Sequence, residues 1–285
     1  MGKQKLNPNA TQKPNDQDFI GVSATAIDCA FERRDSGFPY AREIWDSYDE
    51  LYKPDTSQFI FGGRIEKDER TEKVYDALNK SGITQFLGIA TGLDTHGLAV
   101  TKNNKDTVYV EMLMTEEAKI KQEVLKGVSK QIGGVPNNLH IIEGNALDPE
   151  SYEKASEYFD PTKPVAVVNQ GLLVYFTMEQ KEQLAKNIQW LLSEFGGKWF
   201  TADLRAVTPP PSLIERMKRL EAKTGVKQHF FESQEQIDGL LQRTGLKQKM
   251  IGNDEGSAKK LTNVEKFGHN LKCYEVGLRE QGKKK

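Results

Sequence analysis

From about residue 70 onward, short apolar runs alternate with longer stretches in which apolar side chains recur every three or four positions. The apolar runs predict buried strands, and they lie at residues 84–90, 107–113, 138–144, 164–171 and 198–204. The amphipathic stretches predict helices at residues 69–80, 115–131, 148–159 and 177–195. Within the last of these, Thr177 and Gln180 have the spacing of a capping box. This alternation indicates an α/β protein with a mainly parallel sheet covered on both faces.

The chain changes character on either side of this region. Residues 1–17 are polar and cannot bury enough surface to offset the entropy of ordering, so we expect a disordered arm. Residues 18–66 include a helical segment and an aromatic stretch, which we interpret as packing material or a lid. Beyond the proline run, two helices and a last strand are expected at residues 212–224, 233–245 and 272–276. We therefore predict one domain over residues 18–285, divided into a lid (18–66), a cofactor-binding core (67–205) and a C-terminal part of the sheet with a cap (206–285).

Composition and charge exclude several classes of protein. Lys and Arg number 40 and Asp and Glu 41, a net charge of −1, so no overall positive field draws the chain to nucleic acid. The two cysteines, Cys29 and Cys273, are far apart, which fits a reducing compartment. The four histidines are scattered and predict no metal site. With no apolar run of membrane-spanning or signal-peptide length, we expect a cytoplasmic protein without a membrane partner.

The segment FLGIATGLDTHG places three glycines and an aspartate directly after the first apolar run. In an open parallel sheet, ligands bind beyond the carboxyl ends of the strands. Gly88, Ala90 and Gly92 form a G-x-A-x-G spacing that permits a tight turn and a close approach by a ligand. The fingerprint G-x-G-x-x-G of dinucleotide enzymes is absent, which disfavours a dinucleotide-dependent oxidoreductase. An ordinary strand-to-helix turn is the alternative.

Candidate ligand groups also follow the next three apolar runs. Glu111 lies where a carboxylate can accept hydrogen bonds from ribose hydroxyls. Asn145 offers an amide for an adenine edge, and Ala146 offers a flat apolar contact. Gln170 and Tyr175 follow the fourth run. Taken singly, each of these residues fits a solvated, turn or core position equally well, but together they favour a ligand site at one edge of the sheet.

Several segments, in this order, resemble one known family: FLGIATGLDTHGL, TVYVEMLMTEEAKIKQEVL, LHIIEGNALD, PVAVVNQGLLVYFTMEQKEQLAKNI and KWFTADL. They resemble the leucine carboxyl methyltransferase-like enzymes, which use S-adenosylmethionine and include bacterial O-methyltransferases of polyketide tailoring. SATAIDCAFERRDSGFPYAREI is similar to the opening segment of that family, so the resemblance covers roughly residues 20–205. It implies the class I methyltransferase fold, a doubly wound, Rossmann-like sheet of seven mostly parallel strands, with an N-terminal helical lid.

The resemblance also implies roles for individual residues. Gly88, Ala90 and Gly92 would pack against the methionine part and ribose of S-adenosylmethionine. Arg70 matches a family arginine that holds the cofactor's carboxylate, which a guanidinium can do through a two-point fork; a solvated helix charge is the alternative. The expected cofactor-binding residues are Arg70, Gly88, Ala90, Gly92, Glu111, Asn145, Ala146, Leu147 and Gln170.

The chain departs from the family pattern at three polar positions. Where the family usually has Arg, Asp and Glu, this chain has His96, Leu113 and Gln170. Two of these positions lie close to the expected cofactor site. The departures therefore leave open a second function, that of a catalytically inactive protein of the same fold that binds S-adenosylmethionine.

The leading hypothesis is an S-adenosylmethionine-dependent O-methyltransferase that acts on a carboxylate or hydroxyl of a small molecule. A carboxylate is already ionised at neutral pH and needs no general base, whereas a hydroxyl needs one within hydrogen-bond reach. His96, Asp203 and His229 are the candidate bases, and Tyr175 is the best candidate for contact with the acceptor. We take Tyr175 and His96 as the candidate catalytic residues. The partner expected is a small-molecule acceptor, bound by a monomer or a homodimer.

Overall fold

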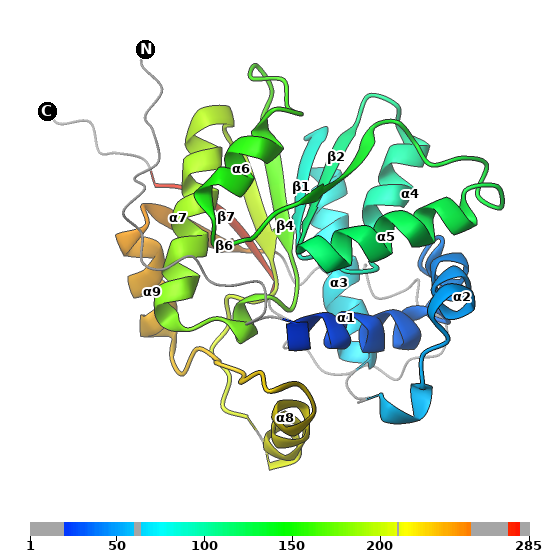
Figure 1. Cartoon of the computed structure of the whole chain (residues 1–285). Coiled ribbons are helices and arrows are strands. Elements are labelled where there is room, and N and C mark those ends of the chain that lie inside the picture. Colours follow the sequence, from blue (N-terminus) through cyan, green and yellow to red (C-terminus); the bar gives the residue numbers. More distant parts are fainter. Residues whose placement is uncertain (1–19, 60–63, 210, 252–272, 280–285) are drawn as a thin grey trace, which may run out of the picture.

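A seven-stranded sheet in the order β3-β2-β1-β4-β5-β7-β6 forms the centre of the molecule (Figure 1). The computed structural model describes residues 20–59, 64–209, 211–251 and 273–279. The strands are β1 Gln85–Ile89, β2 Val108–Leu113, β3 Leu139–Glu143, β4 Val165–Asn169, β5 Gly197–Thr201, β6 Leu246–Met250 and β7 Tyr274–Leu278. Strands β1 to β5 are parallel, and β7 runs antiparallel between β5 and β6. The predicted fold class, a doubly wound and mostly parallel seven-stranded sheet, is confirmed.

Helices cover both faces of this sheet. They are α1 Ile20–Arg33, α2 Ala41–Tyr52, α3 Arg64–Lys80, α4 His96–Asn103, α5 Thr115–Val128, α6 Pro149–Ser156, α7 Met178–Phe195, α8 Pro211–Thr224 and α9 Gln234–Arg243. Two short 3-10 helices, Thr56–Gln58 and Leu173–Tyr175, complete the described elements. One apolar core joins α6, α7 and α9 to the sheet, and a second joins α2, α3, α4 and α5 to its other face.

The central strands form because their residues suit burial on both faces. All five residues of β4 are buried, as expected for an inner parallel strand with an uninterrupted apolar sequence. Helix α7 begins at the predicted capping box, in which the Thr177 side chain accepts from the Gln180 backbone and the Gln180 side chain accepts from the Thr177 backbone. The capping residues therefore fix the point where the chain leaves the β4 loop for the helix.

The structure differs from the sequence expectations at one edge of the sheet, where β7 and β6 lie. Strand β6 was not expected, because LKQKM places Lys247 and Lys249 on an exposed edge and has almost no apolar signal. The last strand is Tyr274–Leu278, two residues beyond the predicted end at residue 276. The expected disordered arm, residues 1–17, lies outside the described residues. Among the described helices, none has the length and apolar character needed to cross a membrane.

The two N-terminal helices occupy different places. Helix α2 packs against α5, where the Ser47 hydroxyl donates to the Val124 carbonyl at 3.1 Å. Helix α1 instead runs across one end of the sheet, beside α8 (Figure 1). The aromatic stretch thus packs on α5, while α1 lies at the end of the sheet where the strand order reverses.

Candidate functional site

A cavity of about 320 Å³ lies at the carboxyl ends of β1 and β4, between which the strand order reverses. Its wall includes residues that follow β1, β3, β4 and β5, together with residues of α1 and α8. This is the position at which open α/β sheets bind their ligands. The volume is at the lower end of the roughly 300–1,000 Å³ found for small-molecule pockets.

The glycine-rich loop after β1 reaches the cavity through Ala90 rather than through its glycines. Ala90 lines the cavity and has a positive φ of 52°, a conformation that is uncommon outside glycine and concentrates at functional sites. Gly92 has a φ of 53°, and a Cβ there would stand 2.8 Å from the Cβ of Ala26 on α1. A Cβ on Gly88 would lie 2.6 Å from Cγ2 of Thr91. Gly88 and Gly92 therefore shape the loop without lining the cavity.

A buried ion pair supports this loop from beneath. Glu111 and Lys121 are each 1% exposed, with 3.1 Å between Oε2 and Nζ. Lys121 donates to the carbonyl of Gly92 at 3.1 Å and to that of Asp94, and the Thr91 hydroxyl donates to Glu111 at 2.7 Å. Because these contacts bury it away from the cavity, Glu111 does not fit the expected role of ribose ligand. Strand alternation explains the difference, since Met112 of the same strand faces the cavity.

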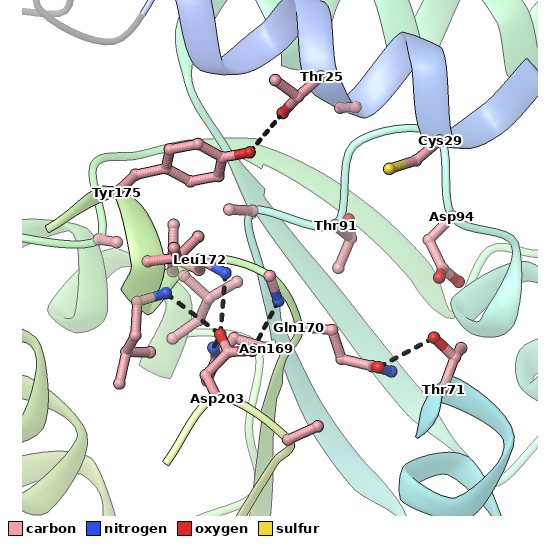
Figure 2. A pocket seen from close by; sticks show the side chains of 18 of the residues that line it. Thr25, Cys29, Thr71, Thr91, Asp94, Asn169, Gln170, Leu172, Tyr175 and Asp203 are labelled. Carbon is pink, nitrogen blue, oxygen red and sulfur yellow. Dashed lines mark hydrogen bonds between the residues drawn. The ribbon is translucent and has the colours of Figure 1, made fainter. Parts of the chain in front are cut away.

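A chain of hydrogen bonds joins α1 to the loop after β4. Arg33 pairs with Asp94 at 2.6 Å and donates to the Thr71 hydroxyl at 3.2 Å. Thr71 in turn donates to Oε1 of Gln170 at 2.9 Å (Figure 2). Among the described residues, the buried Nε2 of Gln170 has no hydrogen-bond partner. Burial alone would raise the pKa of the Asp94 carboxyl. The Arg33 guanidinium helps to hold this pKa below its usual range.

Asp203 organises the loop that carries Gln170 and Tyr175. Its Oδ2 accepts from the Asn169 side chain at 2.8 Å and from the backbone N–H groups of Leu172 and Leu173 at 2.9 and 3.1 Å. Its Oδ1 accepts from the Gly171 N–H at 2.8 Å (Figure 2). With both oxygens engaged in this way, Asp203 fits a positioning role rather than that of a general base. The sequence indicated Asp203 only as a residue that follows the fifth apolar run, and not its partners in the β4 loop.

Tyr175 lies on the opposite side of the cavity, beneath α1. Its hydroxyl donates to Thr25 of α1 at 3.0 Å (Figure 2), and burial raises the pKa of the phenol. His229 also lines the cavity, but its side chain is exposed and its backbone makes the described contacts. Its N–H donates to the Val174 carbonyl, and its carbonyl accepts from Lys181, each at 2.6 Å.

His96 lies behind the glycine loop instead of in the cavity. Its ring stacks on Tyr75 with 3.7 Å between centroids, and only 8% of the residue is exposed. Within the described part of the chain, neither ring nitrogen has a hydrogen-bond partner. Burial lowers the pKa of His96 to about 4, and the negative charge of Asp94 opposes this shift. The expectation that His96 acts as a base is therefore corrected: the imidazole is a neutral packing group.

This neutral histidine predicts a pH-dependent stability. Between pH 6.5 and about 4, the unfolded chain binds a proton at His96 that the folded chain does not bind. The unfolding free energy should therefore fall as the pH falls through this window, by up to about 3 kcal/mol. We expect His96→Phe, which keeps a stacked ring, to flatten this slope in urea titrations at pH 4 to 7. His229→Gln is the control; an equal slope in wild type and His96→Phe would contradict the assignment.

The adenine end of the expected site lies beyond β3. Asn145 and Ala146 line the cavity, while Leu147 is buried below them. The Asn145 side chain accepts from the Leu147 N–H at 2.9 Å, and the Asn145 N–H donates to the Ser151 hydroxyl at 2.9 Å. These bonds hold the turn in a fixed shape, and Leu147 lies outside the cavity in the apolar core.

The structure thus separates the predicted site residues into two groups. Those that line the cavity are Arg70, Ala90, Asn145, Ala146, Gln170 and Tyr175. Those that lie outside it are Gly88, Gly92, Glu111, Leu147 and His96. Sequence reasoning missed Arg33, Thr71 and Lys181, which come from three different helices. Among the described residues, no cluster of three metal-ligating side chains is present.

Comparison with solved structures finds similar folds. A DUF574 family protein from Streptomyces avermitilis has a TM-score of 0.53 and 17% identity, over 90% of this chain and 97% of that chain. The mitomycin 7-O-methyltransferase MmcR has a TM-score of 0.47 and 13% identity, over 93% and 73% of the respective chains. An O-methyltransferase family protein from Burkholderia thailandensis has a TM-score of 0.48 and 14% identity, over 90% and 72%. A comparison with curated proteins finds no match.

The sequence itself matches a family of enzymes over half of its length. Residues 45–189 match the leucine carboxyl methyltransferase family. The matched region runs from α2 to α7 and includes the glycine-rich loop, the buried ion pair and the β4 loop. The chain therefore belongs to the leucine carboxyl methyltransferase family and is a methyltransferase with a methyl donor of the S-adenosylmethionine type.

Proposed function

We propose that this methyltransferase transfers the methyl group of S-adenosylmethionine to a carboxylate or hydroxyl oxygen of a small molecule. The observation that carries the proposal is the cavity at the β1/β4 switch point, in whose wall Gln170 has an Nε2 that no described residue pairs with. An orphaned buried donor costs roughly 1–3 kcal/mol, which a ligand acceptor atom would recover. The donor cofactor offers such acceptor atoms in its carboxylate and ribose hydroxyls.

The direction of the hydrogen-bond chain defines what Gln170 can bind. Arg33 has only N–H groups to offer, so Thr71 accepts from it and keeps its own proton for Oε1 of Gln170. Nε2 is then the part of the amide left for a ligand. We propose that Gln170 donates to the methionine carboxylate of the cofactor, with Arg70 in the same cavity wall supplying positive charge.

The remaining proposed cofactor contacts follow from the cavity wall. Asn145 and Ala146 would receive the adenine, and Ala90 lets the loop approach the ribose closely. When bound, the cofactor supplies an activated methyl group on a sulfonium. The chain's own task is to align donor and acceptor, and such positioning can lower the barrier by roughly 7–11 kcal/mol. Tyr175 is the proposed acceptor contact, since its hydroxyl reaches the cavity beneath α1.

We also propose that residues 18–66 act as the lid of a single domain spanning residues 18–285, with the cofactor-binding core at 67–205. Two contacts of α1 support this role: the 2.6 Å pair of Arg33 with Asp94 and the 3.0 Å bond of Thr25 with Tyr175. Both join α1 to loops of the core across the cavity. The segment that contains His229 lines the same cavity, which supports a cap within residues 206–285.

One observation favours a second function, in which the protein binds the cofactor without catalysis. Leu113 stands where the family usually has Asp. It is 1% exposed and does not line the cavity, so a core residue takes the place of that carboxylate. If the lost carboxylate was needed to orient the donor, binding would survive and transfer would not.

Methyl transfer distinguishes the two functions. Purified protein and S-adenosylmethionine with a labelled methyl group are incubated with matched carboxylic acids, phenols and aliphatic alcohols. We expect labelled product from at least one oxygen acceptor. A methyl ester hydrolyses in mild base whereas an ether does not, so base treatment tells which oxygen was methylated. Binding of S-adenosylhomocysteine without transfer to any acceptor would contradict the enzyme and favour the binding protein.

A further inference from the structure

Lys181 is a buried cation at a position where a positive charge lowers the stability of the fold. It lies in the first turn of α7 and is 1% exposed. A positive charge near a helix N-terminus opposes the helix dipole, and a buried charge carries a desolvation cost. A side chain that lowers stability in two ways and lines a ligand cavity is a candidate for function.

Lys181 is held by a carbonyl and an aromatic ring instead of a carboxylate. Nζ donates to the His229 carbonyl at 2.6 Å and lies 4.4 Å from the ring centre of Phe231. Among the described residues, it forms no ion pair with a carboxylate. Asp203 is the nearby acid, but its oxygens already accept from the N–H groups of the β4 loop. An ammonium has three N–H donors, and the His229 carbonyl takes one of them, so a ligand can accept from another.

The charge is present under ordinary conditions. Burial lowers the pKa of Lys181 to about 8, and the negative charge of Asp203 opposes this shift. At neutral pH most molecules therefore carry the ammonium. Two further cations, Arg205 and Arg216, line the same cavity, and the apolar side chains that line it include Val207, Leu220 and Phe230.

We propose that Lys181 is the residue that selects the acceptor, by binding an anionic oxygen of a small and otherwise apolar acid. This rests on the proposed function, because it takes the cofactor to occupy the opposite end of the cavity near Gln170 and Asn145. Lys181, with Arg205 and Arg216 in the same wall, attracts the acid, and the apolar side chains hold its body. A neutral analogue leaves the buried ammonium without an opposite charge. Selectivity then arises from charge, not from shape alone.

Competition between acids and their amides tests this inference. The full chain is saturated with S-adenosylhomocysteine and titrated with benzoate, phenylacetate and 3-phenylpropionate, and with the three matching primary amides, by ligand-observed NMR. We expect at least one acid to bind, with at least tenfold higher affinity than its amide. Lys181→Met should weaken binding of that acid at least tenfold while the affinity for S-adenosylhomocysteine changes less than twofold. Lys181→Arg should retain part of the preference.

Two further variants keep the test decisive. Lys186→Met removes an exposed lysine of the same helix and should leave acid binding unchanged. Lys181→Gln keeps a donor for the His229 carbonyl and serves if Lys181→Met does not fold. Acids and amides that bind equally, acid binding that survives in Lys181→Met or Lys181→Gln, or no acid binding at all would overturn the inference. Failure to bind S-adenosylhomocysteine would instead count against the proposed function.

Discussion

Lys121→Met is expected to lower the unfolding free energy by about 3–5 kcal/mol, because it leaves the buried carboxylate of Glu111 without its partner. The substitution also removes the donor to the Gly92 and Asp94 carbonyls, so the loop after β1 loses its support. A methionine fills nearly the same space, so the effect arises from charge and hydrogen bonding more than from a cavity.

Urea unfolding of the wild type and three variants measures this effect. Lys119→Met is the matched control, since Lys119 lies on the same helix and is 55% exposed. The double variant Glu111→Met with Lys121→Met should recover most of the loss, because apolar replacement of a whole buried pair is often neutral. A Lys121→Met protein as stable as the control would show that the pair does not support the loop.

The second large effect is expected from Asp203→Asn. In the wild type, backbone N–H groups of the β4 loop donate to both carboxylate oxygens of Asp203. Asparagine replaces one of these oxygens with an NH2 group, which cannot accept a hydrogen bond. The β4 loop therefore cannot keep its shape. Displacement of the loop by about 1 Å would move Gln170 and Tyr175, and errors of that size cost roughly 100-fold in rate. The loss of charge-assisted hydrogen bonds should also lower the unfolding free energy by about 3 kcal/mol.

Steady-state methyl transfer, together with urea unfolding, measures both consequences. Asp238→Asn changes an exposed carboxylate on α9 and should leave rate and stability unchanged. If Asp203 were the general base, Asp203→Asn would abolish transfer without altering stability. That result would contradict the positioning role.

The strands at the centre of the sheet could be predicted because each is a short, mostly apolar run, as expected of a parallel strand covered on both faces. Strand β6 escaped prediction since an edge strand with alternate lysines has no such pattern. The start of a helix could be predicted where neighbouring residues cap it, as Thr177 and Gln180 do for α7. Predictions of this kind depend on a few neighbouring residues.

The candidate site was harder to predict, because its contacts join distant parts of the chain. Arg33 meets Asp94 and Thr71 only after α1 crosses the end of the sheet. Glu111 was rightly placed on β2, but strand alternation turns it toward Lys121 and away from the cavity. Lys181 reads as a solvated helix charge in TMEQKEQ, and only the packing of the His229 segment buries it.

The central claim is that the cavity between the ends of β1 and β4 holds S-adenosylmethionine. Thermal unfolding with and without S-adenosylmethionine, S-adenosylhomocysteine and NAD tests it directly. A ligand at 100 times its dissociation constant stabilises the folded chain by about 2.7 kcal/mol, which raises the midpoint by several degrees in a protein of this size. We predict this rise with both adenosyl ligands and none with NAD. No rise with either adenosyl ligand, or an equal rise with NAD, would contradict the claim.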